Sequence, residues 1–188
     1  MNQDRRTLLN ATAALGAAAL LADNASAAAA PAPTRAVPPG RPGEFDFLAG
    51  EWRISHRRQP RPGDAWDEFT GEATCWTILG GVGSIEELRI PARNFAGMGL
   101  RLLDVSANVW NDFWVNARSG ALTTPGQTGG FVNGVGTFEA NEMDGETPIV
   151  VRGVWDEITP NSCRWRQLIS RDAGASFQEN WVMQWRRA

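Results

Sequence analysis

The sequence has no lysine and no tyrosine, and it contains one histidine and two cysteines among 188 residues. All 18 basic residues are therefore arginine. These absences exclude a Schiff-base lysine, the lysine of a phosphate-binding loop and a tyrosine acid or nucleophile. One histidine and two cysteines are too few for a standard zinc site, so no metal site is expected. The net charge of −3 argues against binding to nucleic acid, because phosphates attract basic surfaces.

The first 27 residues are typical of an export signal. Arg5 and Arg6 precede an apolar run, Leu8 to Leu21, which is shorter than the roughly 20 residues of a membrane helix. Ala25-Ser26-Ala27 has the small residues that a signal peptidase accepts. Residues 1–27 therefore resemble a twin-arginine signal, which predicts the twin-arginine translocase and signal peptidase as partners and a periplasmic or secreted location. An amphipathic N-terminal helix of a cytosolic protein is the alternative.

Residues 28–43 are rich in alanine and proline. Proline opposes both helix formation and pairing within a sheet, so this stretch is predicted to be an extended linker. The folded domain is expected over residues 44–188. No other apolar run approaches the length of a membrane helix, so the mature protein is expected to have no membrane span.

The chain after residue 44 alternates between apolar and polar residues, with glycine, proline, asparagine and aspartate between the alternating segments. This pattern is typical of β-strands joined by turns. A single helical turn is predicted at Phe45–Gly50, ended by glycine. Strands are expected at Glu51–Arg58, Trp66–Leu79, Ser84–Ile90, Gly97–Val105, Trp110–Ala117, Ala121–Thr128, Gly134–Glu142, Thr147–Trp155, Cys163–Ser170 and Phe177–Arg187.

The predicted fold class is all-β: an antiparallel up-and-down β-barrel of about ten strands, with a short N-terminal helical turn. A β-sandwich is the alternative. Closure into a barrel removes the exposed edges of a sheet. A barrel of about eight to ten strands is also wide enough to hold one small ligand.

The nine tryptophans are the main functional signal, because indoles that surround a lumen suit flat or apolar molecules. Alternation places Trp165 and Gln167 on the inner face. Glu87 and Glu179 are predicted to be inward carboxylates, for which Arg152 is the expected partner. Such a pair either fixes the barrel internally or binds the polar head of a ligand. The candidate ligand-binding residues are Trp52, Glu87, Trp114, Arg152, Trp165, Gln167 and Glu179.

No catalytic residue is assigned. The only histidine, His56, lies beside Trp52 and Ile54, where a core or rim histidine is more usual than a catalytic one. The G-x-S-x-G motif of a nucleophilic serine is absent. Cys75 and Cys163 are expected to be two buried thiols, with a disulfide as the alternative.

The segment Phe45-Asp46-Phe47-Leu48-Ala49-Gly50-Glu51-Trp52 resembles the FDFxxGEW opening of a bacterial, often exported family of unknown function that is related to calycins. Glu86-Glu87 and Leu100–Asp104 are also similar to later parts of that family. The resemblance implies a ten-stranded calycin-like barrel, distantly similar to nitrobindins and lipocalins, and no settled activity. Haem-binding nitrobindins use a histidine late in the chain, which this sequence lacks, so haem is not expected and the cofactor stays unknown.

The sequence therefore predicts an exported barrel that binds a small hydrophobic or aromatic ligand in its lumen. One alternative is an isomerase or hydrolase that uses Glu87 or Glu179 as a base, which requires that carboxylate to have no arginine neighbour. The other alternative is a structural or interaction protein of the cell envelope, which requires a filled barrel and a large exposed apolar patch.

Overall fold

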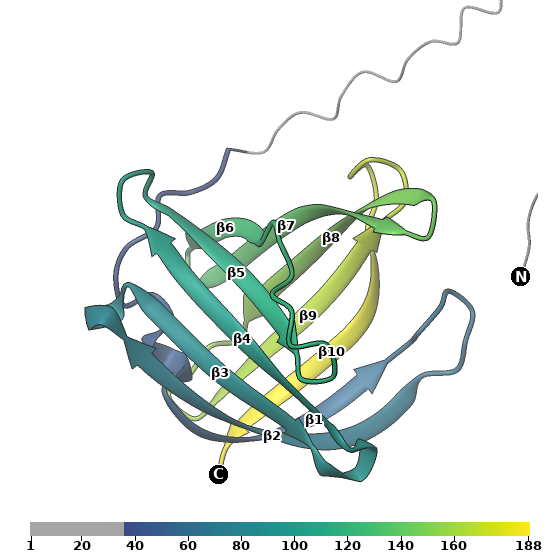
Figure 1. Ribbon diagram of the computed structural model, residues 1–188, viewed down its shortest axis with the longest axis horizontal. Coiled ribbons are helices and arrows are strands. Elements are labelled where there is room, and N and C mark those ends of the chain that lie inside the picture. The colour runs from purple at the N-terminus through teal and green to yellow at the C-terminus, as the bar shows by residue number, and fades with distance from the viewer. Residues whose placement is uncertain (1–35) are drawn as a thin grey trace, which may run out of the picture. The chain divides into compact units, whose positions relative to one another are not determined.

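The computed structural model describes residues 36–188. The predicted export signal at 1–27 lies outside these residues, as does the first part of the predicted linker at 28–43. The described chain forms ten antiparallel strands that close into a single barrel, in which each strand pairs with its neighbours in the sequence and β1 pairs with β10 (Figure 1). The prediction of an up-and-down barrel is confirmed.

Three short 3₁₀ turns accompany the strands: η1 (Asp46–Leu48), η2 (Leu79–Gly81) and η3 (Pro91–Arg93). The strands are β1 (Gly50–Arg58), β2 (Asp67–Ile78), β3 (Gly83–Ile90), β4 (Phe95–Asp104), β5 (Val109–Asn116), β6 (Gln127–Val132), β7 (Val135–Asp144), β8 (Thr147–Asp156), β9 (Ser162–Ser170) and β10 (Gln178–Arg187).

The sixth strand differs from its predicted position at Ala121–Thr128, because β6 begins at Gln127 and includes Gly129 and Gly130. Two consecutive glycines suggest a turn, but here they allow close packing. A Cβ atom on Gly129 would lie 2.0 Å from the carbonyl oxygen of Thr137 on the neighbouring strand. The backbones of β6 and β7 therefore approach each other at a place where a side chain would not fit.

The later start of β6 leaves part of β5 without a strand partner on that side. β5 and β6 pair only between Trp110–Asp112 and Gln127–Gly129. Residues 117–126 fold back along the rest of β5, where the amide of Thr123 donates a hydrogen bond to the carbonyl oxygen of Trp114 at 2.8 Å. This loop therefore completes the barrel wall in place of a strand.

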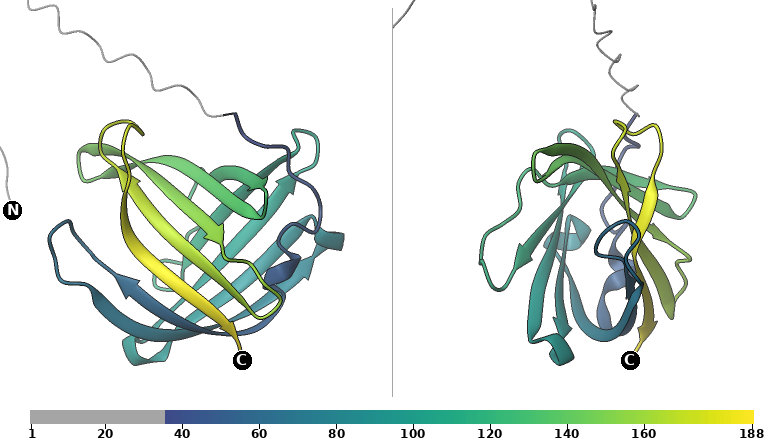
Figure 2. Two further views of the ribbon diagram at one scale, coloured as in Figure 1. Left: turned by 180° about the vertical axis from the view of Figure 1, so that it is seen from behind. Right: turned by 90° about the vertical axis from the view of Figure 1, so that its right-hand side faces the viewer.

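The η1 turn lies inside one end of the barrel, where the strands enclose it in both views of Figure 2. Aromatic side chains around η1 plug this end. The ring of Phe45 lies 5.0 Å from those of Trp110 and Phe131, and Leu48 is fully buried. The predicted helical turn at Phe45–Gly50 therefore forms as η1 and fills this end. We call it the plugged end and the opposite end the far end.

Arg187, near the end of β10, joins the plug to the barrel wall. Its guanidinium lies 4.0 Å from the ring centre of Trp52 and donates to the carbonyl oxygens of Phe47 (2.9 Å) and Ala49. The indole N–H of Trp52 donates to the carbonyl oxygen of Leu48 at 2.6 Å. The first and last strands thus hold η1 from both sides.

Alternation along β1 matches the prediction, because Trp52, Ile54 and His56 are buried between exposed neighbours. Cys75 and Cys163 are free thiols in the interior, so the alternative of a disulfide is wrong. Burial raises the pKa of the Cys163 thiol to about 12, with a smaller contribution from the negative charge of Glu86.

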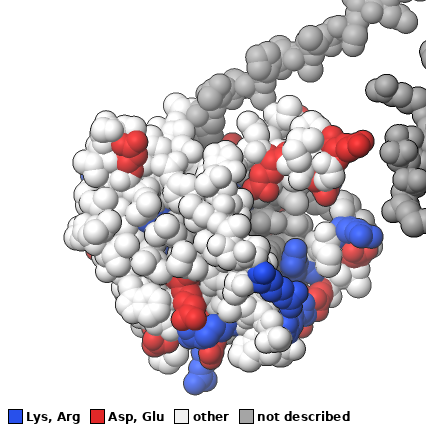
Figure 3. Space-filling view, viewed as in Figure 1, with Lys and Arg blue, Asp and Glu red and all other residues white. Residues whose placement is uncertain are grey.

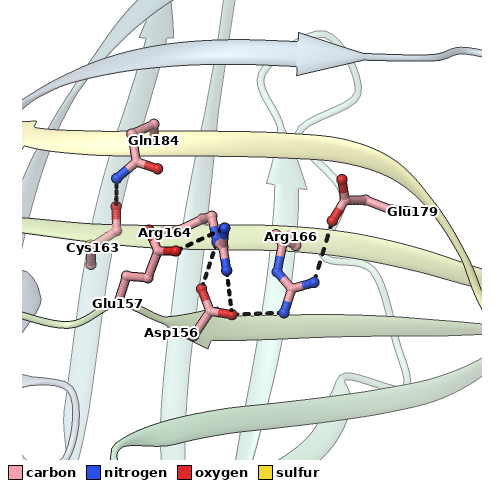
Figure 4. A network of polar contacts seen from close by, with 7 residues as sticks. All are labelled: Asp156, Glu157, Cys163, Arg164, Arg166, Glu179 and Gln184. Carbon is pink, nitrogen blue, oxygen red and sulfur yellow. Dashed lines mark hydrogen bonds and ion pairs between the residues drawn. The ribbon is translucent and has the colours of Figure 1, made fainter.

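The outer face of β8, β9 and β10 carries a network of ion pairs (Figure 4). Asp156 accepts hydrogen bonds from Arg164 at 2.8 Å and from Arg166 at 2.7 Å. Arg166 also pairs with Glu179 at 3.3 Å. Burial opposes the ionisation of Asp156, but the two arginines outweigh it and hold its pKa below the usual value. The network links three strands on the side away from the lumen.

On the face of the molecule seen in Figure 3, acidic and basic side chains lie close together in the lower part, and several acidic side chains lie in the upper part without basic neighbours. No broad basic area forms on this face. This distribution agrees with the net charge of −3.

Candidate functional site

A cavity of about 260 Å³ lies inside the barrel, between the aromatic plug and the far end. Its volume corresponds to about nine water molecules, at about 30 Å³ each, which is the size of a molecule with one or two rings. Aromatic side chains from β5, β8, β9 and β10 form much of its wall: Phe113, Trp114, Trp155, Trp165, Trp181 and Trp185. Leu88 and Met183 add aliphatic surface.

The cavity adjoins a second space of about 500 Å³ at the far end, and the two share Glu142 and Gln167. The second space lies among the β1–β2, β7–β8 and β9–β10 hairpins. Thr123 and Pro125 of the loop at 117–126 also line the inner cavity. A small molecule can therefore approach the cavity from the far end.

A charged group, which we call the buried triad, consists of Glu86 on β3, Arg101 on β4 and Asp112 on β5. Arg101 Nη2 donates to Glu86 Oε2 at 2.5 Å, and Arg101 Nε lies 3.5 Å from Asp112 Oδ2. The side chains of Arg101 and Glu86 are only 5% and 3% exposed. Gly99, two residues before Arg101 on β4, makes room for them, because a Cβ there would lie 2.9 Å from Arg101 Nη2.

The charged groups of the buried triad shift one another's pKa. Burial raises the pKa of Asp112 to about 6; the positive charge of Arg101 opposes this rise and the negative charge of Glu86 adds to it. Burial alone would lower the pKa of Arg101, but the two carboxylates outweigh it and hold that pKa above its usual value. Within the buried triad, Asp112 is therefore the group whose charge changes near neutral pH.

Several buried hydrogen-bond donors near the cavity have no partner among the described residues. They are Arg101 Nε and Nη1 and the indole nitrogens of Trp155 and Trp185. Arg101 also lies 5.2 Å from the ring centre of Trp155. Buried donors usually find a partner, so these groups could serve a polar atom of a bound molecule.

Three of the predicted site residues do line the cavity. Trp165 and Gln167 face inward from β9, and Trp114 faces inward from β5. Trp52 is inside the barrel as well, but it is 1% exposed and belongs to the plug. Trp52 therefore does not line the cavity.

The three predicted charged contacts lie on the outer face, so their inward placement is wrong. Glu87 is exposed and pairs with Arg89 at 3.0 Å. Arg152 pairs with Glu139 across the outer face of β7 and β8 at 2.6 Å, and Glu179 pairs with Arg166. Neighbouring strand residues point to opposite faces, so an error of one position exchanges the lumen for the surface.

A β-bulge in β10 explains the position of Glu179. Trp181, Met183 and Trp185 point into the barrel, but the pairing of β10 with β9 shifts between Glu179 and Trp181. The extra residue, Asn180, breaks the alternation and moves Glu179 to the outside.

The sequence prediction missed the buried triad, together with Glu142 and Trp181. Glu86 shares its strand face with Leu88 and Ile90, both buried, so alternation alone favours Glu86 over Glu87 as the inward residue. Arg101 lies on the same face of β4 as Gly99 and Leu103, but a glycine gives little indication of whether that face points inward. Asp112 offered no such pattern, because both faces of β5 carry aromatic residues.

His56 borders the aromatic wall and is not part of the cavity lining. Its Nδ1 accepts a hydrogen bond from the indole of Trp181 at 3.3 Å, and its ring stacks on Phe69 at 4.5 Å. Burial, with a smaller contribution from the positive charge of Arg93, lowers the pKa of His56 to about 4. His56 is therefore a neutral core histidine near pH 7.

Neither the protein-family models nor the curated proteins compared with the chain gave a match. Within residues 36–188, no helix is long and apolar enough to cross a membrane. The same residues contain no group of three or more histidine, cysteine, aspartate or glutamate side chains that could hold a metal ion.

Proposed function

We propose that this protein is an exported barrel that binds one small hydrophobic or aromatic molecule in its lumen. The observation that carries the proposal is the cavity of about 260 Å³, which combines tryptophan walls with a buried charged group. Ligand sites typically combine apolar walls with a few polar groups in this way. The resemblance to a calycin-like family supports the proposal, and export rests on the twin-arginine-like signal at 1–27.

Filling the cavity should abolish binding. Leu88 lines the cavity and is 1% exposed, so the larger ring in Leu88→Phe would occupy part of the ligand's space. Tryptophan fluorescence titrations with 2-phenylethanol and a panel of other small aromatic molecules provide the measurement. We expect at least one molecule to change the emission of the wild-type protein, and the response to be at least about tenfold weaker in the variant.

Leu168→Phe is the matched control, because Leu168 lies on the outer face of β9, opposite Arg152 of β8. It introduces the same ring outside the lumen and should leave the response unchanged. Thermal melts of both variants show whether the barrel still folds. Equal binding by wild type and the folded Leu88→Phe variant would refute a lumenal site, as would the absence of a response to every molecule in the panel.

Acid–base catalysis in the same cavity is a second candidate function. Glu87 and Glu179 do not meet the condition set for a base, since each has an arginine partner. Asp112 is favoured instead, because a carboxyl that titrates near pH 6 can exchange protons under physiological conditions. Recovery of the bound molecule unchanged after incubation distinguishes binding from turnover.

The role of a structural envelope protein is less well supported. It requires a filled interior, whereas the lumen keeps a cavity lined by polar as well as apolar groups.

A further inference from the structure

We infer that the molecule bound in the cavity is a small organic cation, with its ammonium group against Asp112 and its apolar body between Trp114 and Trp165. The inference rests on the proposed function, because it identifies the class of ligand for the same cavity. Three features of the cavity support the inference: its excess of negative charge, the free hydrogen-bond acceptors of Asp112 and its aromatic walls.

The charges that line the cavity are mostly negative. Glu86 and Asp112 are carboxylates inside the lumen, Glu142 is an exposed carboxylate where the cavity meets the far end, and Arg101 is the one cationic side chain among the residues that line the cavity. With all four groups ionised, the negative charges outnumber the positive ones. An anionic ligand would add to this excess, whereas a cationic ligand would reduce it, which a poorly solvated interior favours.

Asp112 retains capacity to accept hydrogen bonds. Glu86 accepts from Arg101 Nη2 at 2.5 Å, while Asp112 lies 3.5 Å from Arg101 Nε. Apart from Arg101, no described residue donates a hydrogen bond to the Asp112 carboxylate. Its side chain is 16% exposed, compared with 3% for Glu86, so it is the carboxylate of the triad that a ligand can reach.

The aromatic walls beside Asp112 suit a cation. Trp114 follows Asp112 by two residues on the same face of β5, and Trp165 lines the cavity from β9. Ring faces attract ammonium groups, most strongly where water is excluded. Trp155 and Trp181 each already have a guanidinium over the ring, at 5.2 Å and 4.6 Å. Trp185 packs against the ring of Trp52, so Trp114 and Trp165 remain for the ligand.

Charge at Asp112 makes binding dependent on pH. An alkylammonium ion stays charged between about pH 5 and 7.5, whereas Asp112, with a pKa of about 6, loses its charge in that range. The charged groups that act on Asp112 are Arg101 and Glu86, and the exposed Glu142 lines the same cavity. Cation binding should therefore weaken on acidification, anion binding should strengthen, and binding of a neutral molecule should change little.

Three probes with the same phenylethyl body separate these classes: 2-phenylethylamine, 2-phenylethanol and 3-phenylpropionate. Isothermal titration calorimetry of the full chain at about pH 7.5 should give the tightest binding for the amine. Between about pH 7.5 and 5, the amine should lose about fivefold to tenfold in affinity, in line with the titration of Asp112. The alcohol should change by less than about twofold.

Asp112→Asn keeps the shape of the side chain and removes its charge. We expect it to reduce the ratio of amine to alcohol affinity by at least about tenfold. Glu87→Gln removes a carboxylate from the outer face and should leave that ratio unchanged. The pH series on the wild-type protein tests the same point even if the Asp112 variant folds poorly.

The outcomes separate this inference from the proposed function. Equal affinities for amine and alcohol, or a ratio unaffected by Asp112→Asn, would overturn the cation while leaving a lumenal binding site intact. Tightest binding of 3-phenylpropionate would also overturn it, in favour of an acceptor held by the unpaired donors of Arg101, Trp155 and Trp185. No binding of any probe at millimolar concentration would count against both proposals.

Discussion

His56 illustrates how burial determines the behaviour of a single residue. Its ring is 3% exposed and packs between Phe69 and Trp181. Burial lowers its pKa from 6.5 to about 4, so the unfolded chain binds a proton more readily than the folded protein between these two values. The contribution of His56 to stability is therefore complete above about pH 6.5 and is lost as the pH falls to about 4.

Replacement of His56 should make the protein less sensitive to acid. His56→Phe keeps a ring for stacking on Phe69 and removes the titrating group. On moving from about pH 7.5 to 4, the wild type should lose about 3 kcal/mol more unfolding free energy than the variant, at 1.36 kcal/mol per pH unit. Urea denaturation at the two pH values measures this difference. An equal loss in both proteins would show that His56 does not titrate as described.

Single residues also mark the limit of the sequence prediction. Glu86 and Glu87 are adjacent and chemically identical, yet one is 2% exposed in the interior and the other pairs with Arg89 at the surface. The alternation through Leu88 and Ile90 contained the information needed to choose between them. The position of Arg152 was harder to predict. Val150 and Val154, two residues before and after it, suggest an inner face, although all three lie on the outer face of β8.

At the scale of the strand, the regular segments were predictable and the irregular ones were not. Alternation in β1 and β9 gave the correct inner faces, because Trp52, Ile54 and Trp165 each lie next to an arginine. The bulge at Asn180 and the two glycines inside β6 have no such pattern. Both depend on packing against a neighbouring strand, which a single sequence does not reveal.

The C-terminal strand should stabilise the plugged end through Arg187. Its hydrogen bonds to backbone carbonyls of the η1 segment and its contact with Trp52 would all be lost in Arg187→Ala. We expect a loss of at least about 3 kcal/mol of unfolding free energy, given about 1.5–3 kcal/mol for each of two charged hydrogen bonds and a smaller contribution from the aromatic contact.

Arg186→Ala is the control for this prediction, because Arg186 is the adjacent residue of β10 and is exposed. Its loss should change the stability by less than about 0.5 kcal/mol. Chemical denaturation of the two variants provides the comparison. Similar effects from both substitutions would mean that Arg187 does not fasten the plug.

At the scale of the whole molecule, the barrel is divided between structure and site. The plug around Phe45 and Trp110 fills one end, while the cavity and the buried triad occupy the space toward the far end. The sequence predicted a closed barrel with tryptophans inside, because strand spacing and composition reflect the fold. It did not predict which tryptophans pack against η1 and which surround a cavity, since that depends on where the plug ends.

The nine indole N–H groups provide the most direct test of a lumenal binding site. Trp66 and Trp76 are 36% and 46% exposed at the surface, whereas Trp114, Trp165 and Trp181 line the cavity. Indole signals in ¹⁵N-labelled protein can be followed by NMR during titration with 2-phenylethylamine and 2-phenylethanol. We predict saturable shifts for Trp114, Trp165 and Trp181 and none for Trp66 and Trp76. Shifts confined to the two surface tryptophans, or no shifts at all, would contradict a ligand site inside the barrel.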